Sequence, residues 1–346
     1  MTPRQPRTPQ DDRPPPDLPV GGGLLLVDKP SGCTSHDVVG RLRRVLRTRR
    51  IGHAGTLDPM ATGLLVLAVD RSTKLLGHLA LTDKTYLATI RLGQRTDSDD
   101  ADGVVIASHR VDGVTEDAIH AGIDALTGPL MQVPSSVSAI KVDGRRAYDR
   151  VRSGETVELA ARPIVVSRFE ILAGPRLEQV SPEPAAFPAL EAAAVGDLRS
   201  DADPRISVMD IDVAVDCTTG TYVRSLARDL GAALGVGGHL SRLRRTRVGP
   251  FTVDRSVDVF GADPTITPAF ADDIAARIIP AASAVQAAFA TRSVGAELVE
   301  DLRHGRPVPA AGIDGTYGVL DGSGSLVALV TEQGTTARSV LGWLTE

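Results

Sequence analysis

The residues most able to do chemistry lie in one glycine-bounded segment, Gly52-His53-Ala54-Gly55-Thr56-Leu57-Asp58-Pro59-Met60-Ala61-Thr62-Gly63. Asp58 stands between two glycines that accept backbone angles closed to other residues, and Pro59 biases Asp58 toward an extended conformation. This pattern predicts a rigid loop that presents one carboxylate, with His53 as its upstream neighbour. An exposed aspartate in an ordinary turn is an equally good interpretation of these residues alone, because Asp-Pro is a common turn signal.

Asp58 could act as a nucleophile, because a carboxylate that attacks carbon can form a covalent intermediate. To attack at neutral pH it must be ionised although shielded from water, and a bidentate arginine partner favours that state. Arg224 could reach a carboxylate from another loop, since it falls in the first turn of the helix predicted after Gly220, opposite the apolar stripe of that helix. From position alone, a solvent-exposed arginine is the more common outcome.

No motif for a metal or a nucleotide accompanies these residues. The glycine-rich loop is not followed by Gly-Lys-Ser/Thr, which excludes a P-loop. The acidic run Asp97 to Asp102 lacks the spacing and the terminal glutamate of an EF-hand loop. The only two cysteines, Cys33 and Cys217, do not form a cluster with zinc-site spacing. We therefore expect neither a cofactor nor a metal.

A strand and a helix are predicted before the Asp58 loop. The apolar run within Gly23 to Lys29 predicts a short buried strand, closed by a Pro-Ser-Gly turn. Thr34 with Asp37 three residues later forms the capping pattern of a following helix. An apolar stripe at helical spacing then predicts that this helix packs on the core, with Val38, Val39, Leu42, Val45 and Leu46 facing inward.

The segment from Arg41 to Arg50 holds six arginines, and those within the predicted helix lie opposite its apolar stripe. A basic face of this kind is either a solvated helix surface or a contact for RNA phosphates. Because the segment directly precedes the Asp58 loop, we assign Arg43, Arg44 and Arg47 to the RNA backbone.

Further strands are predicted by alternation and by apolar runs. Thr85 to Gly93 places Tyr86, Ala88, Ile90 and Leu92 on one face, and Ser207 to Cys217 is the clearest amphipathic strand. Leu64 to Val69 is a continuous apolar run. Helices are predicted over Ser72 to Ala80, over Thr115 to Thr127 and from Val223 to Leu234. Beyond about Thr291, one short helix and short strands at 317–320, 326–331 and 339–344 predict a small β-rich module.

Several of these segments together resemble the TruB family, the bacterial tRNA pseudouridine-55 synthases. The resemblance is carried by the Asp58 segment, Lys84-Thr85-Tyr86, Leu92 to Asp97 with Asp102-Gly103, Gly220-Thr221-Tyr222-Val223-Arg224, and Leu243-Arg244-Arg245. It covers residues 23–255 with specific motifs and residues 290–346 loosely, where it suggests a PUA-like RNA-binding module.

The resemblance implies a role for each matching residue. Asp58 would be the catalytic nucleophile and Arg224 its partner. Tyr86 would stack on the extruded uracil, Tyr222 and Leu243 would line the base pocket, and His53 would fill the space left in the RNA loop. Lys74, from the helix predicted over Ser72 to Ala80, joins the substrate-binding residues. Arg244 and Arg245 would bind the RNA backbone.

The fold class expected is α+β: a pseudouridine-synthase-like mixed, largely antiparallel central sheet with flanking helices, plus a small C-terminal PUA-like β domain. We expect a disordered tail over 1–22, where the first 20 residues are polar and carry seven prolines. The catalytic domain would span 23–275 and the RNA-binding domain 276–346. Residues 173–205 hold eight alanines and five prolines without a clear period, which predicts a flexible insertion.

Composition sets the broad class and the partners. With 42% hydrophobic and 23% charged residues, the chain is typical of a globular protein with a large core. A net charge of −5 argues only weakly against nucleic acid, because phosphate binding depends on local charge. No signal peptide or membrane-spanning run is present, and the few cysteines fit a reducing compartment. We expect a cytoplasmic monomer that modifies the tRNA T stem-loop at uridine 55, without membrane or obligatory protein partner.

Two other functions remain compatible with the residues alone. An aspartate-nucleophile hydrolase is one, although glycosidases normally pair two carboxylates and the Asp58 loop has one. A non-catalytic RNA-binding or RNA-chaperone protein is the other, since it would use the same basic surfaces and the same C-terminal module.

Overall fold

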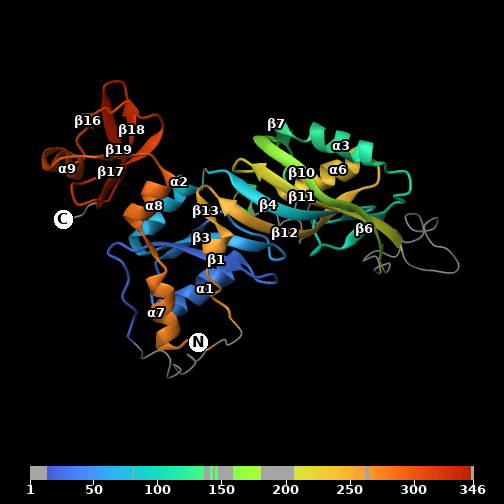
Figure 1. Cartoon of the computed structure of the whole chain (residues 1–346), viewed down its shortest axis with the longest axis horizontal. Coiled ribbons are helices and arrows are strands. Elements are labelled where there is room, and N and C mark those ends of the chain that lie inside the picture. The colour runs from blue at the N-terminus through green and yellow to red at the C-terminus, as the bar shows by residue number, and fades with distance from the viewer. Residues whose placement is uncertain are drawn as a thin grey trace.

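A computed structural model gives the fold, and it describes residues 14–80, 82–135, 141–142, 145–146, 159–180, 206–261 and 265–343. Figure 1 shows a long molecule in which one large sheet carries helices and a smaller sheet lies at one end. Two predictions fall partly outside the described residues. They are the disordered tail, over residues 1–13, and the flexible insertion, over residues 181–205.

Among the described residues, ten strands form the large sheet. Eight of them run in the order β14-β1-β3-β12-β4-β11-β10-β7, while β2 pairs with β3 and β13 with β12. Neighbouring strands are antiparallel except β12 and β3, which are parallel. Their bounds are β1 Gly23–Lys29, β2 Ile51–Ala54, β3 Thr62–Val69, β4 Lys84–Leu92, β7 Gly128–Gln132, β10 Arg162–Val180, β11 Ile206–Cys217, β12 Gly238–Val248, β13 Phe251–Thr252 and β14 Ile279–Pro280. The mixed, largely antiparallel sheet is as predicted.

The strand periodicity predicted from the sequence explains which face of this sheet is covered. Tyr86, Ala88, Ile90 and Leu92 of β4 are buried, as are the alternate residues of β11 from Met209 to Cys217. The register pairs Tyr86 with Val215 and Ala88 with Val213, so the two apolar sets share one face. The opposite face carries charged pairs, of which Arg91 with Asp210 and Arg176 with Asp212 are examples.

Two groups of helices cover the apolar face. Helix α1 (Ser35–Val45) packs with β2 and α7 (Pro268–Ala276), whereas α3 (Glu116–Ala125) and α6 (Val223–Ala233) pack on β10 and β12 (Figure 1). The predicted capping box of α1 is present: Asp37 donates its backbone N–H to the Thr34 hydroxyl, and the Asp37 carboxylate accepts from the Thr34 backbone.

The remaining elements of the first domain are short connections. A single 3-10 helix, η2 (Asp70–Leu75), and one turn of α-helix, α2 (Leu76–Leu79), replace the continuous helix predicted over Ser72 to Ala80. Other short elements are β5 Gln94–Thr96, β6 Val105–Ser108, β8 Lys141–Val142, β9 Arg145–Arg146 and η3 Val253–Arg255.

The C-terminal sheet lies to one side, beyond α8 (Ala281–Ala288) (Figure 1). Its order is β15-β17-β18-β19-β16, and α9 (Ala296–Arg303) packs on it. The strand bounds are β15 Thr291–Ser293, β16 Val308–Pro309, β17 Thr316–Leu320, β18 Leu326–Gln333 and β19 Thr336–Gly342. One apolar cluster joins both sheets, because Leu24 and Val66 of the large sheet belong to the same cluster as Leu329 and Trp343.

Three boundary predictions need correction. Residues 173–180 continue β10 and pair with β11, so they are not part of a flexible insertion. Residues 14–22 are not a disordered tail, because Leu18 packs on the main core and Gly22 is buried. The large sheet extends beyond residue 275, since β14 pairs with β1. The sequence pattern did not predict the continuation of β10, because charged side chains on the outer face of this strand form ion pairs instead of apolar contacts.

Candidate active site

The Asp58 loop connects β2 to β3 and is held by side chains from the end of β1 and the start of α1. Lys29 is fully buried, and its ammonium donates hydrogen bonds to the carbonyls of Pro59 (3.1 Å), Cys33 (2.7 Å) and Pro30 (2.9 Å). The Ser35 hydroxyl accepts from the Leu57 backbone N–H at 3.0 Å. Both backbone neighbours of Asp58 are therefore held, which gives the rigid loop predicted from the sequence.

Gly63 allows β12 to approach this loop. Its φ is +100°, and a Cβ at this position would lie 2.2 Å from the Arg245 carbonyl oxygen. No other residue fits that backbone contact, because L-residues rarely adopt this φ and the space is already filled. The parallel pairing of Gly63 with Arg245 places Leu243 and Arg245 beside the Asp58 loop.

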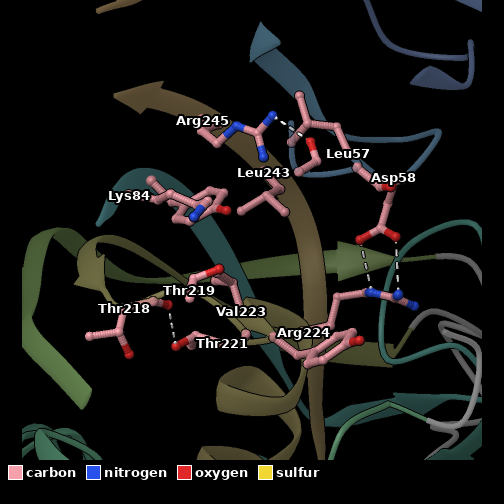
Figure 2. Close-up of a pocket in the computed structure, with 15 residues that line it drawn as sticks. Leu57, Asp58, Lys84, Thr218, Thr219, Thr221, Val223, Arg224, Leu243 and Arg245 are labelled. Carbon is pink, nitrogen blue, oxygen red and sulfur yellow. Dashed lines mark hydrogen bonds and ion pairs between the residues drawn. The ribbon is translucent and has the colours of Figure 1, made fainter. Parts of the chain in front are cut away.

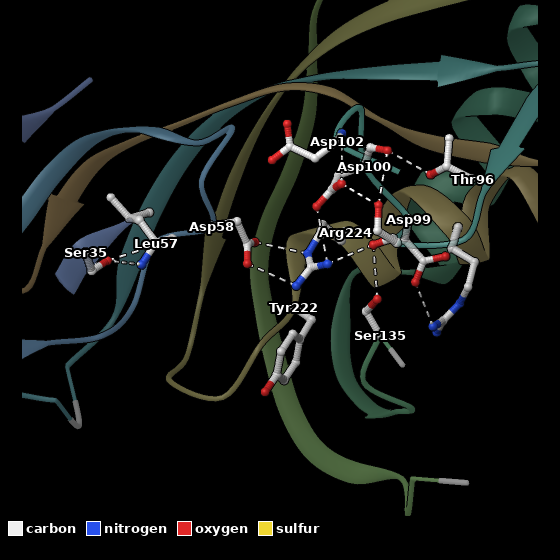
Figure 3. A network of polar contacts seen from close by, with 12 residues as sticks. Ser35, Leu57, Asp58, Thr96, Asp99, Asp100, Asp102, Ser135, Tyr222 and Arg224 are labelled. Carbon is white, nitrogen blue, oxygen red and sulfur yellow. Dashed lines mark hydrogen bonds and ion pairs between the residues drawn. The ribbon is translucent and has the colours of Figure 1, made fainter. Parts of the chain in front are cut away.

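Arg224 and Asp58 form a bidentate ion pair, as predicted. The Arg224 Nη2 donates to Asp58 Oδ1 at 3.0 Å, and Nε lies 3.0 Å from Oδ2 (Figure 3). The arginine side chain is 5% exposed and the aspartate side chain 32% exposed. The carboxylate is thus fixed by a buried cation while remaining open to solvent and to a ligand.

A second carboxylate, which the sequence analysis did not single out, holds the other side of the same guanidinium. Arg224 Nη1 lies 3.3 Å from Asp100 Oδ2 and donates to the Ser98 carbonyl at 2.8 Å (Figure 3). Burial raises the pKa of the Asp100 carboxyl, although hydrogen bonds from Ser98 and the charge of Arg224 oppose the rise. Asp100 lies within the acidic run that was considered only as a calcium loop. Its position between the two parts of a family signature, Leu92 to Asp97 and Asp102-Gly103, was the available signal.

A pocket with a volume of about 270 Å³ opens beside Asp58. Figure 2 shows Asp58 and Arg224 on one side of it and Leu243 with Arg245 on the other. Tyr86, Tyr222 and Leu243 all line this pocket, so the structure brings together the three residues assigned to the base. Tyr86 and Leu243 are buried, and the first turn of α6 with residues 218–221 supplies the remaining wall.

Lys84 and Arg245 also line the pocket, and neither was predicted to do so. Arg245 was assigned to the RNA backbone, but this assignment is wrong because its side chain is 1% exposed. Its guanidinium donates to the carbonyls of Leu64 (2.7 Å) and Gly55 (2.9 Å). Strand periodicity could have found both residues, because Lys84 is two positions from Tyr86 and Arg245 two positions from Leu243.

His53 lies on β2, upstream of the loop and outside the residues that line the pocket. Its ring packs edge-on against His36, with centroids 5.7 Å apart, and its Nδ1 is buried without a hydrogen-bond partner among the described residues. Burial, with smaller contributions from His36 and Arg245, lowers the pKa of His53. Lys74 is exposed on η2 and does not line the pocket, so its assignment to the substrate-binding residues stays a prediction.

Four other arginines were assigned to the RNA backbone. Arg43, Arg44 and Arg47 are exposed on α1 and the turn after it, which agrees with a surface role. Arg244 is instead paired with Asp28 through two hydrogen bonds of 2.6 and 3.0 Å, so its guanidinium already binds a carboxylate. Arg41 departs from the basic face, since it is buried and donates to the Val259 carbonyl.

In the part of the chain that the structure describes, no three His, Cys, Asp or Glu side chains lie together so that they could hold a metal ion. Within the same ranges, no helix is long and apolar enough to cross a membrane.

Three family models match the chain. The N-terminal domain of the TruB family pseudouridylate synthases matches residues 43–181. The tRNA pseudouridylate synthase B C-terminal domain matches residues 224–260, and the C-terminal domain of tRNA pseudouridine synthase II matches residues 289–343. These matches include the Asp58 loop, the Arg224 helix and the C-terminal sheet.

Curated relatives named tRNA pseudouridine synthase B are similar over nearly the whole length. The protein of Rhodococcus jostii (strain RHA1) is 50% identical over 325 residues, which cover 93% of this chain and 94% of the relative. The protein of Mycobacterium tuberculosis (strain ATCC 25618 / H37Rv) is 46% identical over 324 residues, covering 93% and 95% of the two chains.

Solved structures share the fold at lower identity. A chain in a crystal structure of a Cbf5-Nop10-Gar1 complex superimposes with a TM-score of 0.62 at 24% identity, covering 96% of this chain and 90% of that chain. A chain in an H/ACA RNP bound to a substrate RNA containing 2'-deoxyuridine gives 0.61 at 23% identity, with coverages of 97% and 89%. These two likenesses concern the fold alone.

Proposed function

This chain belongs to the TruB family of pseudouridylate synthases and isomerises uridine to pseudouridine in tRNA, and we propose that Asp58 is the nucleophile of that reaction. The reaction breaks the bond between C1' of the ribose and N1 of the base, turns the base, and joins C1' to C5. The hydrogen of C5 leaves as a proton and N1 gains one. Isomerisation therefore needs no second substrate, and the hydrolase and binding-protein interpretations are set aside.

The observation that carries this assignment is the bidentate contact between Arg224 and Asp58. A buried guanidinium fixes both carboxylate oxygens, so Asp58 is oriented before the substrate arrives. Its partial exposure leaves room for attack on carbon inside the pocket. The attack falls either on C1' of the ribose or on the base ring, and the contact is compatible with both.

The pocket receives the base after the uridine has been extruded from its RNA loop. Extrusion costs a few kcal/mol, which stacking and hydrogen bonds within the pocket offset. Tyr86 stacks on the base, while Tyr222 and Leu243 enclose it. His53, on the strand that leads into the Asp58 loop, occupies the space that the base leaves in the RNA.

Exposed arginines and the C-terminal domain bind the rest of the tRNA. Arg43, Arg44 and Arg47 contact phosphates, which makes the affinity depend on salt. The PUA-like domain, which begins near the end of α8, contributes a second RNA-binding surface. The enzyme acts in the cytoplasm as a monomer on the T stem-loop, at uridine 55, without a protein partner.

The test is to locate the product. An unmodified tRNA transcript is incubated with the protein, and pseudouridine is mapped by carbodiimide labelling and primer extension. We expect one new stop, at the position that reports residue 55 in the T loop, and no stop with the Asp58→Asn protein. Stops at other positions alone would contradict the substrate site, and an active Asp58→Asn protein would contradict the nucleophile.

A further inference from the structure

The pocket wall contains two buried cations that the reaction scheme above does not use. Lys84 is 6% exposed and Arg245 is 1% exposed, and both line the pocket beside Tyr86. The Lys84 ammonium donates to the carbonyls of Thr82 (2.7 Å) and Ala80 (3.2 Å). Among the described residues, neither side chain forms an ion pair with a carboxylate, and both donate to backbone carbonyls.

Keeping two such charges together is costly for the folded protein. Burial is the main cause that lowers the pKa of Lys84 to about 8, and the neighbouring Arg245 lowers it further. Cys217 and Asp83 are the groups that oppose this effect, and burial raises the pKa of the Cys217 thiol to about 11. Buried charges are normally paired. An excess of positive charge beside a ligand pocket instead fits a ligand that becomes negative.

The uracil base becomes negative during the isomerisation. When the bond between C1' and N1 breaks, its electron pair stays with the base, and the charge spreads over N1, O2 and O4. If Asp58 attacks C6 of the ring instead, the electrons of the C5–C6 double bond move toward O4. Both routes place an anion on the base, whichever carbon Asp58 attacks. The charge disappears when C1' joins C5, and the C5 proton then leaves as N1 gains one.

We propose that Lys84 and Arg245 form a cationic wall that stabilises the uracil anion formed during the reaction. This inference rests on the proposed function of the pocket. Donors that are oriented in advance and shielded from water stabilise a developing charge more than water does. Burial raises the pKa of the Tyr86 hydroxyl, and Arg245 opposes this rise through its charge and a hydrogen bond, so Arg245 also interacts with the ring that is assigned to stack on the base.

Gly55 lets the catalytic loop lie directly against this wall. A Cβ on Gly55 would lie 3.3 Å from Arg245 Nη1 and 3.6 Å from Lys84 Cε. With its φ of +74°, the glycine brings the backbone that precedes Asp58 next to both cations. Nucleophile and cations therefore face the same small volume, on two sides of the space for the base (Figure 2).

The experiment compares single-turnover tritium release from tRNA labelled at uridine C5 for native protein, Lys84→Met and Lys84→Arg. Lys84→Met should lose on the order of 100-fold in rate constant, as for removal of one donor to a developing oxyanion. Lys84→Arg should recover most of this rate, and the Kd for tRNA should be the same in all three. Arg277→Met, which removes one exposed cation of α7, is the matched control and should react like native protein.

The pH profile separates catalysis from a structural role. The native rate should fall as pH rises through about 8, where Lys84 loses its proton, whereas Lys84→Arg should keep its rate in that range. Deprotonation of the substrate would act on both proteins alike. Identical pH–rate profiles for native protein and Lys84→Arg would overturn the inference. A rate constant of Lys84→Met equal to that of native protein would overturn it as well. No release from native protein would instead contradict the proposed function.

Discussion

The guanidinium of Arg224 is held between two carboxylates, Asp58 on the pocket side and the buried Asp100 on the other. Arg224 and Asp58 are 166 residues apart in the chain, and each is fixed locally, by the first turn of α6 and by the Lys29 contacts of the loop. Asp100 therefore fixes the arginine, and the arginine orients the carboxylate that faces the substrate (Figure 3).

Arg224→Lys should separate charge from geometry. A lysine keeps the positive charge but cannot give two parallel hydrogen bonds to one carboxylate. Loss of one charge-assisted hydrogen bond, roughly 1.5–3 kcal/mol, corresponds to a decrease of roughly 10- to 100-fold in the rate constant. Single-turnover rates measure this, with the Kd for tRNA as a check on binding. A variant as fast as native protein would show that the bidentate contact has no catalytic importance.

Asp100→Asn tests the buried side of the network. Asparagine keeps the shape but removes the charge that faces Arg224, so we expect a slower chemical step with unchanged affinity for tRNA. The loss should be smaller than for Arg224→Lys, about tenfold, because both contacts to Asp58 survive. Asp102→Asn, an exposed carboxylate two positions away, is the matched control. Equal rates for the two variants would show that the Asp100 charge does not contribute to the chemical step.

The basic surface of α1 is tested by salt dependence. Replacing Arg43, Arg44 and Arg47 by glutamine should weaken tRNA binding and leave the single-turnover rate at saturation unchanged. Each lost phosphate contact should reduce the slope of log K against log salt by roughly 0.7 to 0.9. Binding isotherms at several salt concentrations give the slope, with Arg277→Gln, directly after α7, as a control for one surface charge. An unaltered slope for the triple variant would mean that this helix is only a solvated surface.

Stability should fall on mild acidification because of buried histidines. His239 is 4% exposed, and burial lowers its pKa from 6.5. The pKa of His239 is lower in the folded state than in the unfolded state. The contribution of neutral His239 to stability is therefore fully present above pH 6.5 and is lost as pH falls toward the folded-state pKa. Asp99 and Asp100, whose pKa values are raised by burial, act in the opposite direction.

A comparison of variants isolates the histidine contribution. Thermal unfolding of native protein and His239→Gln at pH values from 7 down to 5 should give a steeper fall of Tm for native protein. His120→Gln, a surface histidine of α3, serves as the control and should follow the native curve. Parallel curves for native and His239→Gln would contradict the assignment to His239.

Periodicity and motifs predicted the sheet and the central ion pair. The alternation in β4 and β11 placed Tyr86 and Val215 on one buried face, and the glycines around Asp58 predicted a fixed loop. What the sequence could not give is contact between distant segments. Asp100 meets Arg224 only because the loop after β5 lies against β12, where Asp100 forms a bridge with Leu240.

The errors have physical causes too. Arg245 was assigned to phosphates because it is charged and follows Arg244, although it shares the inward face with Leu243. A buried guanidinium is uncommon, and only the backbone carbonyls of Leu64 and Gly55 make it acceptable there. Irregular pairing between Arg245 and Arg247 then breaks the alternation of β12, so simple periodicity does not continue through the arginine cluster.

The most direct test of the nucleophile measures tritium release from tRNA labelled at uridine C5, with native protein and with Asp58→Asn. Release requires loss of the hydrogen from C5, so it reports isomerisation and not binding. Asparagine preserves the size of the side chain and can still accept hydrogen bonds from Arg224. We predict release by native protein, none by Asp58→Asn, and equal tRNA affinity for the two. Release by Asp58→Asn at the native rate would contradict the central claim.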